Sequence, residues 1–272
     1  MMLKDAKINA NGKTGTNILV HGLGRLGRSV CAAVADGGAQ RGLSVVAAIK
    51  NTPLASNEVA KFDFPVYTNV ADCSCNADVI VDCSVASATG GIVAHALQTR
   101  TPLVICTTGH SDEVDSAIKA AAELIPVFVS ANMSLGVNIA VKLAAIAAKA
   151  LNNYDFDIEI LERHHNQKLD APSGTARWLA DSIFDAIGEK QVVYDRSETL
   201  AKRGKEQVGI HSIRGGTIVG DHTVIFAGPD ETIEIKHSAL SRDAFARGVL
   251  AAAVFTARQA PGLYVMDDLI NL

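Results

Sequence analysis

Residues 18–30 read ILVHGLGRLGRSV, a short apolar run followed by three glycines and a segment of helical composition. Gly22, Gly24 and Gly27 have the spacing G-x-G-x-x-G. Between a strand and a helix, this spacing permits a tight turn and brings backbone N–H groups and the helix N-terminus close to a pyrophosphate. The stretch therefore predicts a dinucleotide-binding βα unit; a flexible turn is the simpler alternative.

The rest of the first half alternates short β-branched runs with Ala-rich segments. Their length, apolarity and flanking turn residues predict buried strands at 18–20, 43–49, 77–82, 102–106 and 126–130. Helical length and composition predict helices at 25–36, 86–99 and 112–123. This alternation predicts an α/β fold with a Rossmann-type parallel sheet that helices cover on both faces.

The pattern changes after about residue 131. A long helix is predicted after Ser134, which is a candidate N-cap. The remaining predicted elements are a strand at 156–165, a helix at 173–187, strands at 208–216, 217–228 and 231–239, and a helix at about 241–258. Short turns join the last three strands, so we expect them to be antiparallel. The second half is thus predicted to be an α+β domain with a mixed, largely antiparallel, open sheet.

Composition limits the classes of function. The 272 residues are 48% hydrophobic and 20% charged, as in a folded globular protein. The net charge of −4 lacks the basic excess that nucleic-acid binding requires. Residues 1–15 are polar without the apolar core of a secretory signal, and Lys142 and Lys149 interrupt the most apolar helical stretch. We therefore expect a cytoplasmic protein with no nucleic-acid or membrane partner.

Five cysteines occur in the chain without a CxxC pair. An odd number with this spacing fits neither a disulfide framework nor a zinc site. We expect reduced, structural thiols and no metal site.

Candidate cofactor contacts follow the predicted strands, because ligands of open α/β sheets bind beyond the carboxyl ends of the strands. Lys50 ends the second strand, and a basic residue there can pair with the 2′-phosphate of NADP. Lys50 therefore favours NADPH over NADH, with a solvated strand end as the alternative. Thr107, Thr108 and Asn132 are short polar groups suited to a nicotinamide ribose and carboxamide, or to strand-end capping alone.

The segment ERHHNQKLDAPSGTA, residues 162–176, collects groups that transfer protons or bind anions. Histidine titrates near neutrality, which makes His164 or His165 a natural proton donor, and Lys168 adds a cation or a second acid. Ser173 is a candidate N-cap of a helix whose first N–H groups can bind an anion such as a carboxylate. Helix capping alone would explain the serine but not the neighbouring histidines and lysine.

This segment resembles the signature of the dihydrodipicolinate reductase family, also called 4-hydroxy-tetrahydrodipicolinate reductase, of bacterial lysine and diaminopimelate synthesis. The resemblance extends in order through Arg25 of the glycine loop, TTG at 107–109, SANMSLGVN at 130–138, IRGG with VGDHTVIFAG, and GLYVMDDLINL. It implies reduction of a cyclic, dicarboxylated imine-type substrate by hydride from NADPH or NADH. It also implies His164 as the catalytic acid and Lys168 as its partner proton donor.

The resemblance implies further site residues. The substrate carboxylates are expected to bind His165, Ser173, Gly174 and Thr175. Together with Lys50, the expected cofactor contacts are Gly22, Leu23, Gly24, Arg25, Leu26, Gly27, Cys106, Thr107, Thr108, Ser130, Asn132 and Met133. Asp170 is interpreted as orienting the loop or Lys168.

The resemblance further implies the domain organisation. The dinucleotide-binding domain is expected to comprise 1–131 and 242–272, and the substrate-binding and tetramerisation domain 132–241, with homotetramers formed through the second sheet. His21 and Cys106 stand where the family usually has glycine, and Lys50 replaces a common acidic residue, so the cofactor pocket is expected to be narrower. The alternatives are a dehydrogenase acting on an amino or hydroxy acid, and a non-catalytic NAD(P) sensor.

Overall fold

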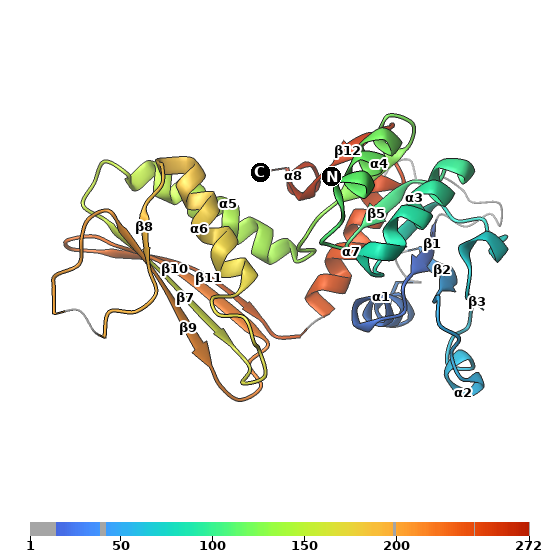
Figure 1. Cartoon of the computed structure of the whole chain (residues 1–272), viewed down its shortest axis with the longest axis horizontal. Helices are drawn as coiled ribbons and strands as arrows, with labels where there is room; N and C mark the ends of the chain where they lie inside the picture. Colours follow the sequence, from blue (N-terminus) through green and yellow to red (C-terminus); the bar gives the residue numbers. More distant parts are fainter. Residues whose placement is uncertain (1–14, 39–41, 198–199, 242, 272) are drawn as a thin grey trace. The chain divides into compact units, whose positions relative to one another are not determined.

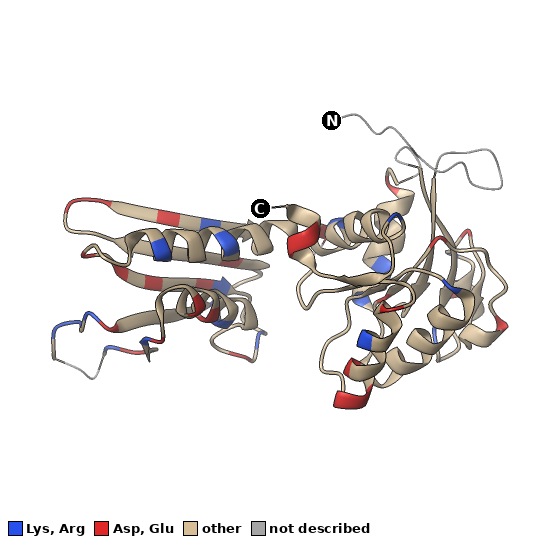
Figure 2. Ribbon diagram, turned by 90° about the horizontal axis from the view of Figure 1, so that it is seen from above, with Lys and Arg blue, Asp and Glu red and all other residues tan. Residues whose placement is uncertain are grey.

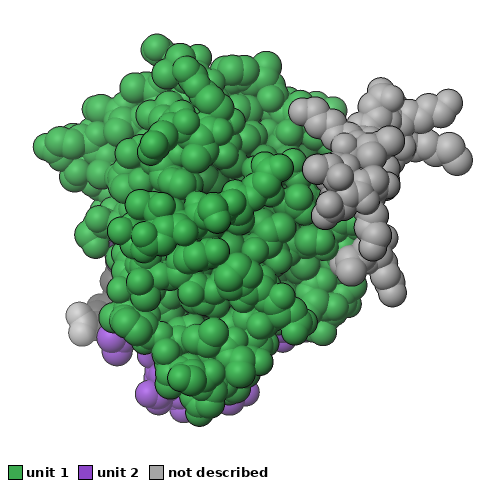
Figure 3. All heavy atoms as spheres, turned by 90° about the vertical axis from the view of Figure 1, so that its right-hand side faces the viewer, with its two compact units in different colours: residues 1–134, 243–271 green, residues 135–242, 272 purple. Residues whose placement is uncertain are grey.

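The computed structural model of the chain describes residues 15–38, 42–197, 200–241 and 243–271, which form two compact units (Figure 1). Unit 1 comprises Met1–Ser134 and Asp243–Asn271, and unit 2 comprises Leu135–Arg242 and Leu272 (Figure 3). Residues 1–14 of the polar N-terminal stretch lie outside the described residues. So do residue 242, near the start of the last predicted helix, and residue 272, at the end of the C-terminal segment GLYVMDDLINL.

Unit 1 contains a seven-stranded sheet in which every pairing is parallel. Its strands are β1 (Thr16–His21), β2 (Leu43–Ile49), β3 (Val66–Tyr67), β4 (Val79–Asp82), β5 (Leu103–Ile105), β6 (Pro126–Val129) and β12 (Gly262–Tyr264). Their order is β12-β6-β5-β4-β1-β2-β3. The strand order reverses at β1, between β2 and β4, which is where ligands bind in doubly wound sheets.

Helices pack on both faces of this sheet (Figure 1). The helices of unit 1 are α1 (Arg25–Ala35), α2 (Ser56–Val59), η2 (Val70–Asp72), α3 (Ala86–Thr99), α4 (Asp112–Ala122), α7 (Asp243–Thr256) and α8 (Met266–Ile270). Those that pack on the sheet faces are α1, α3, α4 and α7. α3 packs beside α4 and α1 beside α7. The predicted Rossmann-type sheet is confirmed, while the short α2, β3, η2, β12 and α8 carried too little periodicity to be predicted.

The strands of unit 1 are buried because their side chains are apolar on both faces, as a doubly covered parallel sheet requires. On one face, Leu19, Ile80 and Ile105 pack with residues of α3 and α4. This core holds the carboxyl ends of the parallel strands at one edge, and the candidate cofactor residues follow the ends of β1, β2, β5 and β6.

Unit 2 contains a five-stranded mixed sheet in the order β11-β10-β7-β9-β8. Its elements are α5 (Leu135–Leu151), β7 (Asp157–His164), α6 (Gly174–Ile187), β8 (Gln191–Val193), β9 (Gln207–Arg214), β10 (Gly220–Ala227) and β11 (Thr232–Ala239). β10 pairs antiparallel with both β11 and β7, whereas β7–β9 and β8–β9 are parallel. The sheet is mixed as predicted, but the expectation that it is largely antiparallel is wrong, because parallel and antiparallel pairings occur in equal number.

The expected pairing of the two strands within 208–228 is not formed, because β7 lies between β9 and β10. The connection at 215–219 crosses the end of β7 instead of making a hairpin. The Gly215 N–H donates to the His164 carbonyl at 2.9 Å, and the Asn166 N–H donates to the Gly216 carbonyl at 3.2 Å. β10 therefore begins only at Gly220, three residues later than predicted.

α5 and α6 cover one face of the second sheet (Figure 1). Alternate residues of β7, such as Ile158 and Ile160, form the core with Leu179 and Ile183 of α6. Acidic and basic residues are interspersed along both units (Figure 2). No helix among the described residues is long and apolar enough to cross a membrane.

Candidate active site

The turn after β1 accepts only glycine at two positions. Gly22 has φ of +95°, and a Cβ there would lie 2.7 Å from backbone atoms of Cys83 and Ser84. A Cβ on Gly27 would lie 1.9 Å from the Gly22 carbonyl oxygen, so α1 packs directly on the turn. Gly24 caps the N-terminus of α1 and is exposed, with open space around it. The turn thus leaves helix N–H groups accessible to a phosphate.

His21, at the end of β1, is directed into the interior of unit 1. The side chain is 5% exposed, and Nδ1 lies 2.9 Å from the Asp82 carboxylate. Asp82 also accepts hydrogen bonds from the hydroxyls of Ser84 and Thr89 at 2.5 and 2.8 Å. Burial opposes ionisation of Asp82, but these hydrogen bonds outweigh it and lower its pKa. The bulk of His21 is therefore accommodated within the domain by a buried polar network.

The strand-end residues differ in what they offer a ligand. The Thr107 hydroxyl is buried without a hydrogen-bond partner, and Thr108 is exposed beside it. Contact with the Cys83 thiol, together with burial, raises the pKa of Cys106, so Cys106 is a neutral group. Lys50 donates to the Thr52 hydroxyl at 3.0 Å.

The loop after β6 is held by local hydrogen bonds. The Ser130 hydroxyl donates to the Asn132 carbonyl at 2.9 Å, and the Ser134 N–H donates to the Asn132 side-chain oxygen at 2.9 Å. Met133 is buried. The glycine turn, the open start of α1 and the unpartnered Thr107 hydroxyl together fit a dinucleotide, and these residues would hold it.

In unit 2, a polar cluster replaces the apolar core at the end of β7. Glu162 follows Ile158 and Ile160 on the core face and is 0% exposed. Arg214 donates to both carboxylate oxygens, at 2.7 and 2.8 Å, and the Ser173 N–H donates at 3.1 Å. Burial opposes ionisation of Glu162, yet hydrogen bonds from Arg214 and His164 in particular lower its pKa to about 2. Glu162 is therefore an anion at neutral pH.

His164 lies next to this anion. Its Nδ1 is 2.6 Å from Glu162 Oε2, and because an ionised carboxylate only accepts, Nδ1 carries the proton. Nε2 is consequently the nitrogen that titrates. Burial lowers the pKa of His164 and Glu162 opposes that effect, whereas Lys168 and Arg214 reinforce it. A Cβ on Gly220 would lie 3.0 Å from Nε2, so glycine leaves room beside this atom.

Ser173 and His222 form the adjoining part of the cluster. The Ser173 hydroxyl accepts from the Ala176 N–H at 3.2 Å, which confirms the predicted N-cap of α6, and lies 2.9 Å from His222 Nε2. Ser173 is 2% exposed, so its polar groups are used within the protein. His222 packs edge-on against His164, with ring centroids 5.2 Å apart. Gly174 is exposed at the helix start, and Thr175 is half-buried.

The loop after His165 is closed by charged groups. Lys168 Nζ lies 2.8 Å from Asp170 Oδ1, and the Arg214 guanidinium donates to the Asp170 carbonyl at 2.6 Å. The Lys168 N–H donates to the His165 carbonyl at 3.2 Å. The Asp170 carboxylate thus contacts Lys168, and the main-chain carbonyl of Asp170 ties the loop to Arg214. The structure brings His164, Lys168 and the α6 start together on this one unit.

Sequence reasoning gave no individual role to Arg214 or His222. Both lie in segments that match the family pattern, IRGG and VGDHT. His222 alternates with Val224 and Phe226 on the core face of β10. A polar residue at a core-facing position was the available signal.

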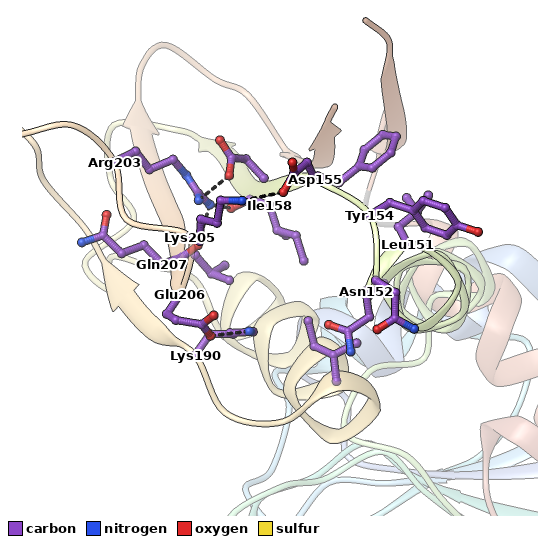
Figure 4. A pocket seen from close by; sticks show the side chains of 16 residues that line it. Leu151, Asn152, Tyr154, Asp155, Ile158, Lys190, Arg203, Lys205, Glu206 and Gln207 are labelled. Atoms are coloured by element: carbon purple, nitrogen blue, oxygen red, sulfur yellow. Dashed lines mark hydrogen bonds and ion pairs between the residues drawn. The ribbon is translucent and has the colours of Figure 1, made fainter. Parts of the chain in front are cut away.

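A cavity of about 450 Å³ lies at the opposite end of β7, which spans roughly 25 Å. Figure 4 shows its rim, where Lys205 pairs with Asp155 and Lys190 with Glu206. Arg203, also at the rim, pairs with Asp157 at 2.6 Å and Glu159 at 2.9 Å. The Lys and Arg side chains at this rim are thus ion-paired with carboxylates.

The fold and these two groups of residues define an NAD(P)-dependent oxidoreductase with a nucleotide-binding unit and a separate acid-bearing unit. Residues 16–133 match the family description "Dihydrodipicolinate reductase, N-terminus", and residues 136–270 match "Dihydrodipicolinate reductase, C-terminus". The chain belongs to the dihydrodipicolinate reductase family, as the motif at residues 162–176 predicted.

Individual relatives agree. The 4-hydroxy-tetrahydrodipicolinate reductase of Clostridium novyi is 43% identical over 258 residues, covering 94% of this chain and 98% of the relative. That of Caldanaerobacter subterraneus is 49% identical over 210 residues, covering 77% and 83%.

Solved structures share the fold. The dipicolinate-bound dihydrodipicolinate reductase from Paenisporosarcina sp. TG-14 has a TM-score of 0.75 at 24% identity, covering 92% of this chain and 97% of that one. A myo-inositol dehydrogenase from Corynebacterium glutamicum has a TM-score of 0.59 at 14% identity, with 94% and 93% covered. At these identities the likeness concerns the fold alone.

Proposed function

We propose that the chain catalyses NAD(P)H-dependent reduction of 4-hydroxy-tetrahydrodipicolinate to tetrahydrodipicolinate in lysine and diaminopimelate synthesis. The observation that carries this proposal is the cluster of Glu162, His164, Lys168 and Arg214 beside the start of α6. It combines titratable nitrogens with a place for anions, as a dicarboxylated imine-type substrate requires. A non-catalytic sensor would have no use for these acids, and the curated relatives are reductases.

Substrate carboxylates are bound by His165 and by the N–H groups of Gly174 and Thr175. Gly174 is exposed with open space around it, and helix N-terminal N–H groups favour anions. Ser173 supports this site as the N-cap, because its own hydroxyl and N–H already have partners. Fixing the carboxylates orients the ring for reaction and converts binding energy into a lower barrier.

His164 and Lys168 deliver the proton. Loss of the 4-hydroxyl group as water converts the substrate into a conjugated imine. A reduced nicotinamide, when bound, would supply hydride to the conjugated carbon, and this addition leaves negative charge at the ring nitrogen, which takes up the proton. His164 Nε2 is free to carry a proton, since Nδ1 is held by Glu162. Lys168 is a second donor, oriented by Asp170. General-acid catalysis of this kind typically contributes about 10²–10⁴-fold to a rate.

The cofactor is held by the glycine turn at 22–27, by 106–108 and by 130–133. We infer a preference for NADPH, because Lys50 follows β2, where the adenosine ribose binds in such folds, and its ammonium can pair with a 2′-phosphate. NADH serves as the alternative donor.

Unit 1 acts as the nucleotide-binding domain, and unit 2 acts as the substrate-binding and oligomerisation domain. We propose a homotetramer assembled through the sheet face of unit 2 that neither α5 nor α6 covers. A cytoplasmic location suits the five free thiols.

A coupled assay tests the proposal. The purified chain should oxidise NADPH or NADH only when the product of dihydrodipicolinate synthase is supplied. Absence of turnover with both cofactors, from a protein that binds NADPH, would refute the assignment.

A further inference from the structure

We infer that Glu162 is a positioning residue for the proposed reduction, which fixes the tautomer of His164 and ties the acid to the anion-binding start of α6. This inference rests on the proposed function. Glu162 lies near the end of β7, and the sequence alone gave it no role in the reaction. Its side chain nevertheless forms hydrogen bonds with His164, Arg214 and Ser173, which lie in three different segments of unit 2. A hydrogen bond with the Ser212 side chain also lowers the pKa of Glu162.

The contacts of the carboxylate divide between its two oxygens. Oε2 lies 2.6 Å from His164 Nδ1 and accepts from Arg214 Nη1 at 2.8 Å. Oε1 accepts from Arg214 Nη2 at 2.7 Å and from the Ser173 N–H at 3.1 Å. One buried anion thus holds the acid on β7, the guanidinium on β9 and the cap of α6 in a fixed arrangement.

This arrangement determines which nitrogen of His164 can act. With Nδ1–H committed to Glu162, the proton is gained and lost at Nε2, beside the space left by Gly220. A carboxylate on the far nitrogen also stabilises the protonated ring. The other charged or titratable groups around His164 are Lys168, Arg214 and His222. The charges of Lys168 and Arg214 disfavour the imidazolium form of His164, and the neutral His222 ring does not stabilise it. Glu162 is the anion that opposes them.

The cluster is specific to this face of the sheet. On the opposite face of β7, Glu159 makes a similar set of contacts, to His211 at 2.8 Å, Arg203 at 2.9 Å and Arg196 at 3.2 Å. That network contacts neither His164 nor the start of α6 in the described structure. Glu159 therefore provides a matched control for loss of a Glu–Arg–His network as such.

Glu162→Gln tests the inference through the pH dependence of kcat. His164 must be protonated to act as the acid, so kcat falls as pH rises through its pKa. Removing the anion lowers that pKa, and the descending limb should move to lower pH by about one unit. We expect kcat to fall by about 100-fold or more, with a much smaller change in KM. Glu159→Gln should leave the limb at the wild-type pH.

Glu162→Asp separates charge from position. It keeps the anion but shortens its reach by about 1.5 Å, one C–C bond. We expect a reduced kcat with the limb close to the wild-type pH. Two outcomes would overturn the inference. In one, the descending limb moves equally far in Glu159→Gln and in Glu162→Gln; in the other, it moves in neither variant. An unmoved limb with a normal kcat in Glu162→Gln would do the same.

A measurement on the wild-type chain covers the case in which the variants do not fold. ¹⁵N-histidine NMR of the full chain, with the His164 signal identified by its loss in His164→Gln, reports the tautomer directly. The Nδ1–H form is expected, and an Nε2–H form would refute the role of Glu162. Because this experiment needs no substrate, it stands even if the coupled assay shows that the proposed function is wrong.

Discussion

Acidification should destabilise unit 2 through His222, and His222→Gln should remove this sensitivity. His222 is 7% exposed, its Nδ1 has no partner, and Nε2 lies 2.9 Å from the Ser173 hydroxyl. Burial first, and then the neighbouring His164, lower its pKa from 6.5 to about 4. The folded state therefore keeps the ring neutral over a pH range in which the unfolded chain binds a proton.

The sign and size follow from linkage. A depressed histidine pKa favours the unfolded state as pH falls, so the loss begins near pH 6.5 and is complete near pH 4. A difference of about 2.5 pKa units corresponds to about 3 kcal/mol of unfolding free energy. At neutral pH, His222→Gln should cost about 1 kcal/mol for the altered bond to Ser173. The two stability curves should therefore cross at about pH 6, below which the variant is the more stable.

Urea unfolding of both proteins between pH 4 and 8 measures this difference. Trp178 is the single tryptophan of the chain and lies in α6 against the core of unit 2. Its fluorescence reports unit 2 separately from unit 1, which matters because two units need not unfold in one step. The pKa values of His164 and His237 are also lowered by burial, but both groups remain in the variant, so their contributions largely cancel in the comparison.

A stability difference between wild type and His222→Gln that stays constant from pH 8 to pH 4 would refute this argument. It would mean that His222 binds a proton equally readily in the folded and unfolded states, with water or a rearranged partner at Nδ1 in the folded state. A curve that instead falls only below pH 4 would assign the acid sensitivity to carboxylates such as Glu162, whose stabilisation is lost as pH decreases from about 4.5 towards 2.

Four further substitutions, which make three predictions, test the two candidate sites. Gly27→Ala should destabilise unit 1 by about 3 kcal/mol, because its Cβ would meet the Gly22 carbonyl. Gly24→Ala is the control, which should leave the melting temperature unchanged and only weaken NADPH binding. Equal melting temperatures of the two variants would contradict the packing argument. Lys168→Ala should lower kcat by about 10²–10⁴-fold with an unchanged NADPH dissociation constant in a fluorescence titration; a parallel loss of NADPH binding would place Lys168 at the cofactor. Lys50→Glu should lower the ratio of kcat/KM for NADPH to that for NADH by about tenfold, the value of one charge-assisted hydrogen bond; an unchanged ratio would make Lys50 a solvated strand end.

Most of the secondary structure followed from the sequence, because periodicity and turn residues are local properties. Strand β2 and helix α3 begin and end at the predicted residues. The spacing of Gly22 and Gly27 predicted a turn that the structure shows to be sterically closed to other residues. The motif at 162–176 indicated the family, since its polar residues are contiguous and need no tertiary information.

Strand pairing in unit 2 depended on tertiary structure. Short connections between the strands at 208–239 predicted neighbouring antiparallel partners, but β7 inserts between β9 and β10. Local sequence specifies that a strand forms and which side chains share a face. It does not specify the neighbour, which depends on the burial of the whole apolar face against α5 and α6.

The sequence by itself determined the Rossmann-type half, the candidate acid and the helix start that can bind anions. Only the tertiary structure placed Arg214 on Glu162, His222 on Ser173 and His21 on Asp82, pairs that are 49 to 61 residues apart. The physical reason is that a buried charge or imidazole must find its hydrogen-bond partner within the folded interior. Sheet register chooses that partner, and register is a property of the assembled sheet.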